Sequence, residues 1–432
     1  MAARSPLRRA LSNFSVLMGG RAVAGVLSVV VLALAARALD AEAFGVLVLV
    51  HTAAVVVRGL FNFKPSDTVV RYGVAAFDQS DGEGFGRVLS FTLGLDLICG
   101  IASALAMLLV ALFAAEWLGL SEALVGPAAL YAVALLVSGT GSARGVLRVA
   151  DRFDAISLQQ TVAPVVRLLG IGLAAAFGWG LTEFVLIWVA ASLAEYLNML
   201  RLGWRELRRH GMKLVRPSLS YRADDRVWGF VWTVYWQSNL EMAQRHGLIL
   251  LAGAVLGPAA AGMFRIAREF ADVLAKPVVV VRQAVFPDLA RLWQQHVEDG
   301  SGTSEFRRLC VRLGLLSALV AALVVGAIAI YGALLLELLV GDSYVYGAGL
   351  LTWLMLAAAI DFGSASLRPA AYAMGFAARA LHIQLVGAAV NVVLFAALLP
   401  LLGLTGIGIA AAAASMTVVA AMAWLLAKGA GS

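Results

Sequence analysis

The sequence predicts an all-α integral membrane protein of twelve transmembrane helices, arranged as two six-helix bundles related by a parallel internal repeat. Three observations predict this class. Of 432 residues, 62% are hydrophobic and only 14% are charged, whereas a soluble domain has roughly 25% charged residues. A helix needs about 20 apolar residues to cross a bilayer core about 30 Å thick, and the chain contains twelve apolar runs of about that length. The loops between these runs alternate in their content of basic residues.

The apolar runs follow one another along the whole chain. The first is longer than the core of a signal peptide, so we expect an uncleaved helix there. The runs lie near 14–36, 44–61, 88–115, 124–147, 158–177, 184–200, 228–252, 259–281, 309–336, 348–367, 381–399 and 404–427.

The loop charges predict the orientation in the membrane. Alternate loops at 116–126, 178–183, 253–259, 337–349 and 400–406 contain no Lys or Arg, and the loop at 37–43 contains only Arg37. The other loops are basic, so the positive-inside rule places them and both termini in the cytoplasm. The net charge of +7 is therefore a topology signal. A protein that binds nucleic acid needs a basic soluble domain, and we expect none here.

Short matches between the two halves suggest a duplication, each weak alone but in the same order along the chain. Six spans per half is an even number, so the second half enters the membrane in the same direction as the first, which defines a parallel repeat. We expect bundles at 1–200 and 227–432, joined by a linker at 201–226, and a central cleft between the bundles. The matches are Leu39, Ala43 and Gly45 with Leu256, Ala260 and Gly262, then Glu116 and Gly126 with Glu337 and Gly347, then 180–192 with 403–415.

The linker at 201–226 is strongly basic. It holds eight Arg or Lys residues against Glu206, Asp224 and Asp225. This composition fits an amphipathic helix on the anionic inner leaflet, and it equally fits a solvated linker.

Ionisable residues concentrate between residues 228 and 291, inside otherwise apolar sequence. Charged groups at membrane depth are expensive and usually face a bundle interior or a water-filled cavity, so this concentration predicts a polar pathway. Its members are Glu241, Gln244, Arg245, His246, Arg265, Arg268, Glu269 and Asp272.

Three stretches resemble a known family. The segments "LAARALDAEAFGVLVL", "LAGAVLGPAAAGMFRIAREFADVLAKPVVVVRQAVFPDLARL" and "LLPLLGLTGIGIAAAAAS" are similar to those of the polysaccharide flippases in the multidrug/oligosaccharidyl-lipid/polysaccharide exporter superfamily. Related members often carry an acid near the middle of the seventh helix, where this chain has Leu248.

The resemblance implies a function, a substrate and partners. It implies flipping of an undecaprenyl-diphosphate-linked oligosaccharide from the cytoplasmic to the outer leaflet of a bacterial inner membrane, for lipopolysaccharide, capsule or exopolysaccharide assembly. The implied partners are membrane lipids and, in the assembly, a polysaccharide polymerase and chain-length proteins.

Arginine suits the diphosphate of such a substrate because its planar fork pairs with phosphate oxygens and stays charged. We expect an Arg-lined cavity that alternately opens to the two sides of the membrane. The candidates for substrate binding are Arg21, Arg58, Arg245, His246, Arg265 and Arg268. For Arg21 and Arg58 the alternative is snorkelling toward the interface.

Acidic residues in the spans are the candidates for ion coupling. They are Glu241, Glu269, Asp272 and Asp361. Several are one helical turn from an arginine, so pairing within a single helix is the alternative. Asp96 and Asp361 are isolated, and each fits either a cation or proton site or a hydrogen-bonded structural acid.

No enzyme class is supported. The outer loops are too short for a catalytic domain, no nucleotide-binding motif is present, and Cys99 and Cys310 lack metal-ligand spacing. We expect neither cofactor nor metal. The alternatives are an Na⁺- or H⁺-coupled multidrug or metabolite antiporter of the same superfamily, whose cavity should be acidic and aromatic, and a scaffold without transport activity.

Overall fold

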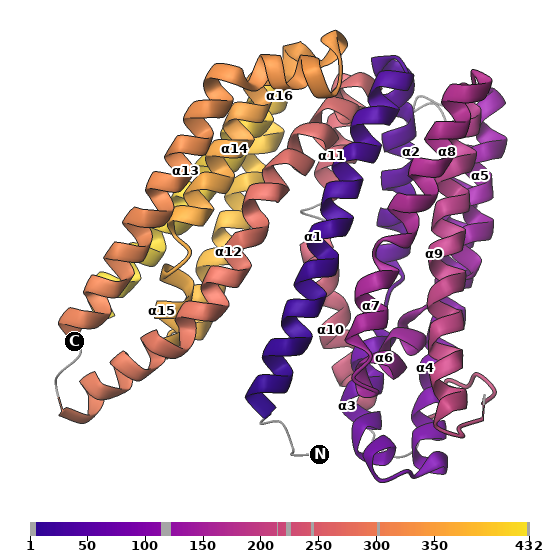
Figure 1. Cartoon of the computed structure of the whole chain (residues 1–432), viewed down its shortest axis with the longest axis horizontal. Coiled ribbons are helices and arrows are strands. Elements are labelled where there is room, and N and C mark those ends of the chain that lie inside the picture. The colour runs from indigo at the N-terminus through magenta and orange to yellow at the C-terminus, as the bar shows by residue number, and fades with distance from the viewer. Residues whose placement is uncertain are drawn as a thin grey trace. The chain divides into compact units, whose positions relative to one another are not determined.

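The computed structural model describes residues 6–113, 122–213, 215–221, 226–242, 246–299 and 303–429, and all regular elements in these ranges are helices (Figure 1). The chain forms two compact units, Met1–Ala259 and Ala260–Ser432. Eight described helices are long and apolar enough to cross a membrane, or nine if one bent pair counts as a span. The predicted all-α membrane class is confirmed, while the number twelve, the repeat and the domain boundaries stay predictions.

The first unit is a bundle of long helices with short helices at one end. In Figure 1 the short helices α3, α6 and α7 gather at the end where α1 begins and α9 finishes. The elements are α1 (Pro6–Ala38), α2 (Ala41–Leu60), α3 (Pro65–Asp78), α4 (Gly82–Phe113), α5 (Glu122–Leu136), α6 (Gly141–Val149), α7 (Phe153–Gln159), α8 (Val162–Phe177), α9 (Leu181–Arg209), α10 (Val227–Met242) and α11 (Leu248–Leu256).

The predicted run at 124–147 is two helices rather than one. Helix α5 ends at Leu136 and α6 begins at Gly141, and the two are bent by 41°. The break holds Ser138, Gly139 and Thr140, whose hydroxyl groups and missing side chain favour turns over helix. This break opens a polar space inside an apolar stretch.

Helix α3 was not predicted, because its residues were assigned to a loop. Its apolar face packs on neighbouring helices: Val69 lies in a buried cluster with Phe85 and Leu89 of α4, Val146 of α6 and Leu207 of α9. A stretch with one apolar face is a helix only when a partner covers that face. Its stability therefore comes from residues up to about 140 positions away, which local pattern does not reveal.

Ion pairs fix the same end of the first unit. Arg152 of the α6–α7 turn binds Glu206 of α9 at 2.9 Å, and Glu206 also binds Arg209 at 3.1 Å. A hydrogen bond to Asp154 raises the pKa of Arg152 above its ordinary value. Arg148 of α6 also pairs with Asp67 of α3. Several basic residues of the sequence therefore have a structural role in addition to any role in orientation.

The described part of the basic segment at 201–226 falls into two pieces. Its first part is the end of α9, which continues to Arg209. Farther on, Ser90 of α4 donates its hydroxyl to the Arg216 carbonyl at 2.6 Å, and the Ser90 carbonyl accepts from the Ser218 amide at 2.9 Å. The described part at 215–221 therefore lies along α4.

The second unit consists of long helices with a short helix, α15, near one end. The last two predicted runs fall in one continuous element, which changes direction at Gly403, where φ is 57°. Pro400, three residues earlier, lacks the amide that would continue the helix. The elements are α12 (Pro258–Asp299), α13 (Thr303–Leu339), the 3₁₀ turn η2 (Asp342–Gly347), α14 (Ala348–Gly363), α15 (Leu367–Ala373) and α16 (Ala377–Gly429).

Candidate functional site

A small polar cavity lies inside the first unit, at the break between α5 and α6. Its volume is about 90 Å³, which leaves room for several water molecules or one small anionic group. The walls come from the end of α2, the start of α3, the middle of α4 and the α5–α6 break. The lining residues are Arg58, Asn62, Lys64, Pro65, Ser66, Asp96, Cys99, Ser103, Ser138, Gly139, Thr140, Gly141 and Arg144.

Asp96 of α4 shapes the cavity by capping α6. Its two carboxylate oxygens accept hydrogen bonds from the amides of Gly141 at 3.0 Å and Ser142 at 2.7 Å, and Asp96 is only 6% exposed. The first amides of a helix have no partner within the helix, so an acid at this position satisfies them. Gly139 lies so close to the Asp96 backbone that any side chain would collide with it.

Positive charge predominates in the cavity. Arg58, Lys64 and Arg144 face a single acid, Asp96, whose oxygens are already engaged by amides. Among the described side chains none lies at ion-pair distance from Arg58 or Arg144. The guanidinium of Arg58 lies over the Tyr196 ring of α9 at 4.5 Å. The cavity therefore has an excess of positive charge that can attract an anion.

Two buried polar atoms in the walls also lack a partner. They are Nε of Arg58 and the hydroxyl of Ser103, and both residues line the cavity. A buried donor without a hydrogen bond is unfavourable, so these two atoms add uncompensated polarity to the walls of the cavity. Arg21 of α1 and Arg148 of α6 lie near enough to act electrostatically on Arg144.

A second polar chain crosses the first unit nearer the middle of α2. The ring of His51 lies between the Tyr131 hydroxyl of α5, at 3.1 Å from Nδ1, and Arg167 of α8, at 3.3 Å from Nε2. Arg167 also lies over the Trp188 ring of α9 at 5.2 Å. Four helices thus meet at one histidine.

The predicted substrate-binding residues are placed at several positions. Arg58 lines the polar cavity, and Arg21 is exposed on α1 near Arg144. His246 is half-buried just before α11. Arg245 lies outside the described residues, so its predicted role is carried forward only as a proposal.

Four predicted residues form a stripe on α12. Arg265 donates to Glu269 one turn away at 2.8 Å, and Arg268 and Asp272 are both half-buried on the same helix. Their spacing of three, four and seven residues places them on one face. The sequence spacing allowed within-helix pairs of Glu241 with Arg245 and of Arg268 with Asp272, whereas the ion pair observed on α12 joins Arg265 and Glu269.

Two further candidates for ion coupling lie elsewhere. Asp361 is half-buried near the end of α14, and its backbone carbonyl accepts the Ser364 hydroxyl at 3.1 Å. Glu241 lies in α10, but its side chain is outside the described part of the structure. The roles of both remain predictions.

Most of the polar cavity is not predicted by the sequence. From the sequence, Lys64 is assigned to a basic loop, Arg144 fits either snorkelling toward the interface or a place in the cavity, and Asp96 is isolated. A signal was present: the polar string Ser138-Gly139-Thr140-Gly141-Ser142 interrupts an apolar run. What the sequence could not show is that this string meets Asp96, 45 residues away.

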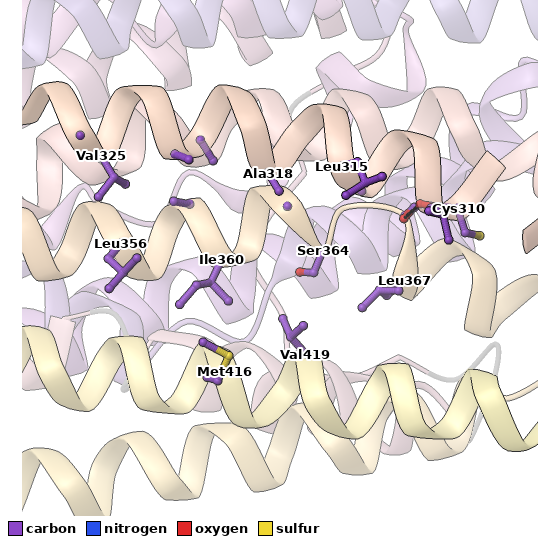
Figure 2. A pocket seen from close by; sticks show the side chains of 18 residues that line it. Cys310, Leu315, Ala318, Val325, Leu356, Ile360, Ser364, Leu367, Met416 and Val419 are labelled. Carbon is purple, nitrogen blue, oxygen red and sulfur yellow. Dashed lines mark hydrogen bonds between the residues drawn. The ribbon is translucent and has the colours of Figure 1, made fainter. Parts of the chain in front are cut away.

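The second unit holds a larger, apolar groove of about 810 Å³ (Figure 2). Figure 2 shows Leu356 and Ile360 of α14 with Met416 and Val419 of α16 around the same space, and α13 forms the remaining wall with Val325. Small residues of α13 such as Gly314, Ala318 and Gly326 leave the groove open. With no charged residue in its lining, it suits hydrocarbon rather than a polar head group.

Among the residues that the structure describes, no three His, Cys, Asp or Glu side chains are grouped so as to hold a metal ion. The polar side chains that gather around the polar cavity are mainly arginines, hydroxyl-bearing residues and one capped acid. Such a set binds anions by charge and hydrogen bonds.

Comparison with known sequences gives two matches that span most of the chain. Residues 10–293 match a family model described as "Polysaccharide biosynthesis protein". The "Inner membrane protein YghQ" of Escherichia coli (strain K12) is 30% identical over 328 residues, which are 75% of this chain and 90% of that protein.

Comparison with solved structures confirms the fold class. A structure of "Lipid II flippase MurJ, inward closed conformation" has a TM-score of 0.64 at 13% identity, over 93% of this chain and 86% of that one. An inward-facing multidrug resistance MATE family transporter of the MOP superfamily has a TM-score of 0.59 at 14% identity, over 96% and 94%. These relatives are a flippase and a transporter rather than enzymes, which agrees with the class expected from the sequence.

Proposed function

The chain belongs to the polysaccharide biosynthesis protein family, and on that premise we propose that it flips a lipid-linked oligosaccharide across the bacterial inner membrane. The proposed substrate carries its saccharide on undecaprenyl diphosphate. The family match, the inner-membrane relative and the flippase-like fold support this class of function. Both termini are proposed to be cytoplasmic, as the loop charges indicate.

The observation that carries the proposal is the excess of positive charge in the polar cavity. A diphosphate is a dianion or more, and Arg58, Lys64 and Arg144 outnumber Asp96 in the lining of the cavity, while Glu195 of α9 acts electrostatically on Arg144 from outside that lining. Arginine forks pair with phosphate oxygens through two parallel hydrogen bonds. We propose that Arg58, Arg144 and Lys64 hold the head group during one stage of an alternating-access cycle.

The remaining predicted residues are proposed to act elsewhere on the substrate route. Arg21 adds positive charge near Arg144. We propose that Arg245, His246, Arg265 and Arg268 contribute to substrate binding, and that Glu241, Glu269, Asp272 and Asp361 serve ion coupling. A polymerase and chain-length proteins are the proposed partners in assembly.

The charge of the cavity also argues against the competing function. A drug antiporter that takes up cations needs an acidic site, whereas this cavity has three basic residues and one acid, and that acid is capped. We therefore do not propose a cation-drug antiporter.

A flipping assay in proteoliposomes tests the proposal. The probe is a fluorescent, short-chain polyprenyl-diphosphate disaccharide, and the readout is the rate at which it becomes accessible on the other leaflet. We expect Arg58→Ala with Arg144→Ala to lower this rate by about tenfold or more, because each charge-assisted hydrogen bond contributes about 1.5–3 kcal/mol.

The matched control is Arg87→Ala, which removes an exposed arginine from α4 outside the cavity. It should flip the probe at the wild-type rate. Equal rates in the cavity variant and the wild type would refute the proposed role of the cavity, and no flipping by any form would refute the flippase itself.

A further inference from the structure

His51 has a different polar partner on each ring nitrogen. Nδ1 lies 3.1 Å from the Tyr131 hydroxyl, and Nε2 lies 3.3 Å from an Nη of Arg167. Tyr131 is only 1% exposed, and His51 and Arg167 are half-buried. This arrangement restricts where the imidazole can carry a proton.

The partners determine the tautomer. A guanidinium donates hydrogen bonds and accepts none, so Nε2 of His51 must be the acceptor. The ring proton then lies on Nδ1 and is donated to the Tyr131 hydroxyl, and the buried Ser192 of α9 lies near that hydroxyl. The observed contact with Arg167 therefore requires a neutral histidine.

We infer that His51 is a proton-binding site at which a proton on Nε2 competes with Arg167. The proton adds to the Nε2 lone pair and forms an N–H bond, while the hydrogen bond from Arg167 is lost and no covalent bond breaks. Two adjacent cations then repel each other, so protonation separates α2 from α8. The site takes a proton and needs no metal or other cofactor.

The same helices connect this site to the polar cavity. Arg58 follows His51 by seven residues on α2, which is about two turns and the same face. Ser192 and Tyr196 are one turn apart on α9, and Arg58 lies over the Tyr196 ring. A shift of α2 on protonation therefore moves a cavity arginine. This coupling step rests on the proposed function, whereas the proton site itself does not.

The charged and titratable groups around His51 bear on the competition between a proton and Arg167 for Nε2. Arg167 is a charged group in direct contact with Nε2. Helix α11 carries no titratable side chain. Helices α1, α4, α5, α9, α10 and α11 pack against α2, and Arg167 of α8 contacts His51 directly. The titratable or charged groups on or beside the packed helices include Tyr131 of α5, Glu195 and Tyr196 of α9, Asp96 and Cys99 of α4 toward the cavity, Arg21 of α1, Tyr235 of α10 and His246 just before α11.

Nuclear magnetic resonance of the purified full chain with ¹⁵N-labelled histidine tests the proton site directly. His51→Gln identifies the His51 signal. We expect the wild type at pH 7 to show the neutral form with its proton on Nδ1. Arg167→Gln removes the competing cation and should raise the imidazolium fraction several-fold at pH 6. A proton on Nε2 in the wild type, or an unchanged imidazolium fraction in Arg167→Gln, overturns the inference.

Flipping of the same fluorescent probe between pH 5.5 and pH 8 tests the coupling. The wild-type rate should depend on pH, and His51→Gln should flatten that dependence. The matched control is His382→Gln, which changes an exposed histidine of α16 that hydrogen-bonds only locally to the Ala378 carbonyl, and it should keep the wild-type profile. A wild-type profile in His51→Gln overturns the coupling. If the wild type itself moves no probe, the proposed function fails and the resonance result alone decides the proton site.

Discussion

At the scale of single residues, Asp96 shows how a membrane-embedded acid can be structural. From the sequence it fitted either an ion site or a hydrogen-bonded acid, and the structure supports the second role. Both carboxylate oxygens accept amides at the start of α6. The capping residue and the capped helix are 45 residues apart, so no local pattern connects them.

Asp96→Ala should destabilise the fold. The substitution leaves two buried amides without acceptors, which we expect to lower the free energy of unfolding by about 1–2 kcal/mol. Asp96→Asn keeps one acceptor oxygen and should lose less. Thermal unfolding in detergent measures both changes. Asp78→Ala, at the exposed end of α3, is the control with no expected shift, and equal melting temperatures for Asp96→Ala and Asp78→Ala would show that the cap is unimportant.

At the scale of elements, hydropathy located the long helices well because length and apolar content are properties of a continuous stretch. It failed where the structure depends on contacts between distant residues. Helix α3 forms against α4, α6 and α9, and the α5–α6 break is stabilised by Asp96. For the same reason, Arg58 was predicted as a site residue, whereas its cavity neighbour Lys64 was assigned to a loop and Arg144 fitted either snorkelling or the cavity.

A close contact between elements gives a second stability prediction. A side-chain carbon at Gly45 of α2 would overlap the Pro258 carbonyl at the start of α12. Gly45→Ala should therefore force the backbones apart and lower stability by about 1–3 kcal/mol, as overpacking does. Gly172 of α8 has nothing within 4 Å of the added carbon, so Gly172→Ala is the matched control and should be neutral or slightly stabilising. The melting temperatures of the two variants, measured by thermal unfolding, give the comparison. A Gly45→Ala protein as stable as Gly172→Ala would disprove the close approach.

At the scale of the whole molecule, the distribution of basic residues predicts the orientation. We expect a cysteine placed at Ser80 to be labelled from the cytoplasmic side and one at Gly178 from the outside, because the segment that contains Ser80 carries Lys64 and Arg71 whereas the loop at 178–183 has no Lys or Arg. Labelling of intact cells with a membrane-impermeant maleimide, in a background without Cys99 and Cys310, measures this. The reverse pattern would invert the proposed direction of transport.

At this scale the molecule has a cationic cavity in one unit and an apolar groove in the other. The cavity offers charge and hydrogen bonds to an anionic head, and the groove offers only hydrocarbon contact. A lipid-linked saccharide likewise has an anionic head group at one end and a hydrocarbon chain at the other. The central claim is that charge in the first unit selects the head group.

Binding to the purified protein in detergent tests that claim most directly, by comparing a fluorescent polyprenyl-diphosphate saccharide with the uncharged polyprenol of the same chain length. The account predicts that the wild type binds the diphosphate at least about tenfold more tightly, a difference of about 1.4 kcal/mol, and that Arg58→Ala with Arg144→Ala removes this preference. Equal affinity of the wild type for the two lipids, or an unchanged preference in the double variant, would contradict it.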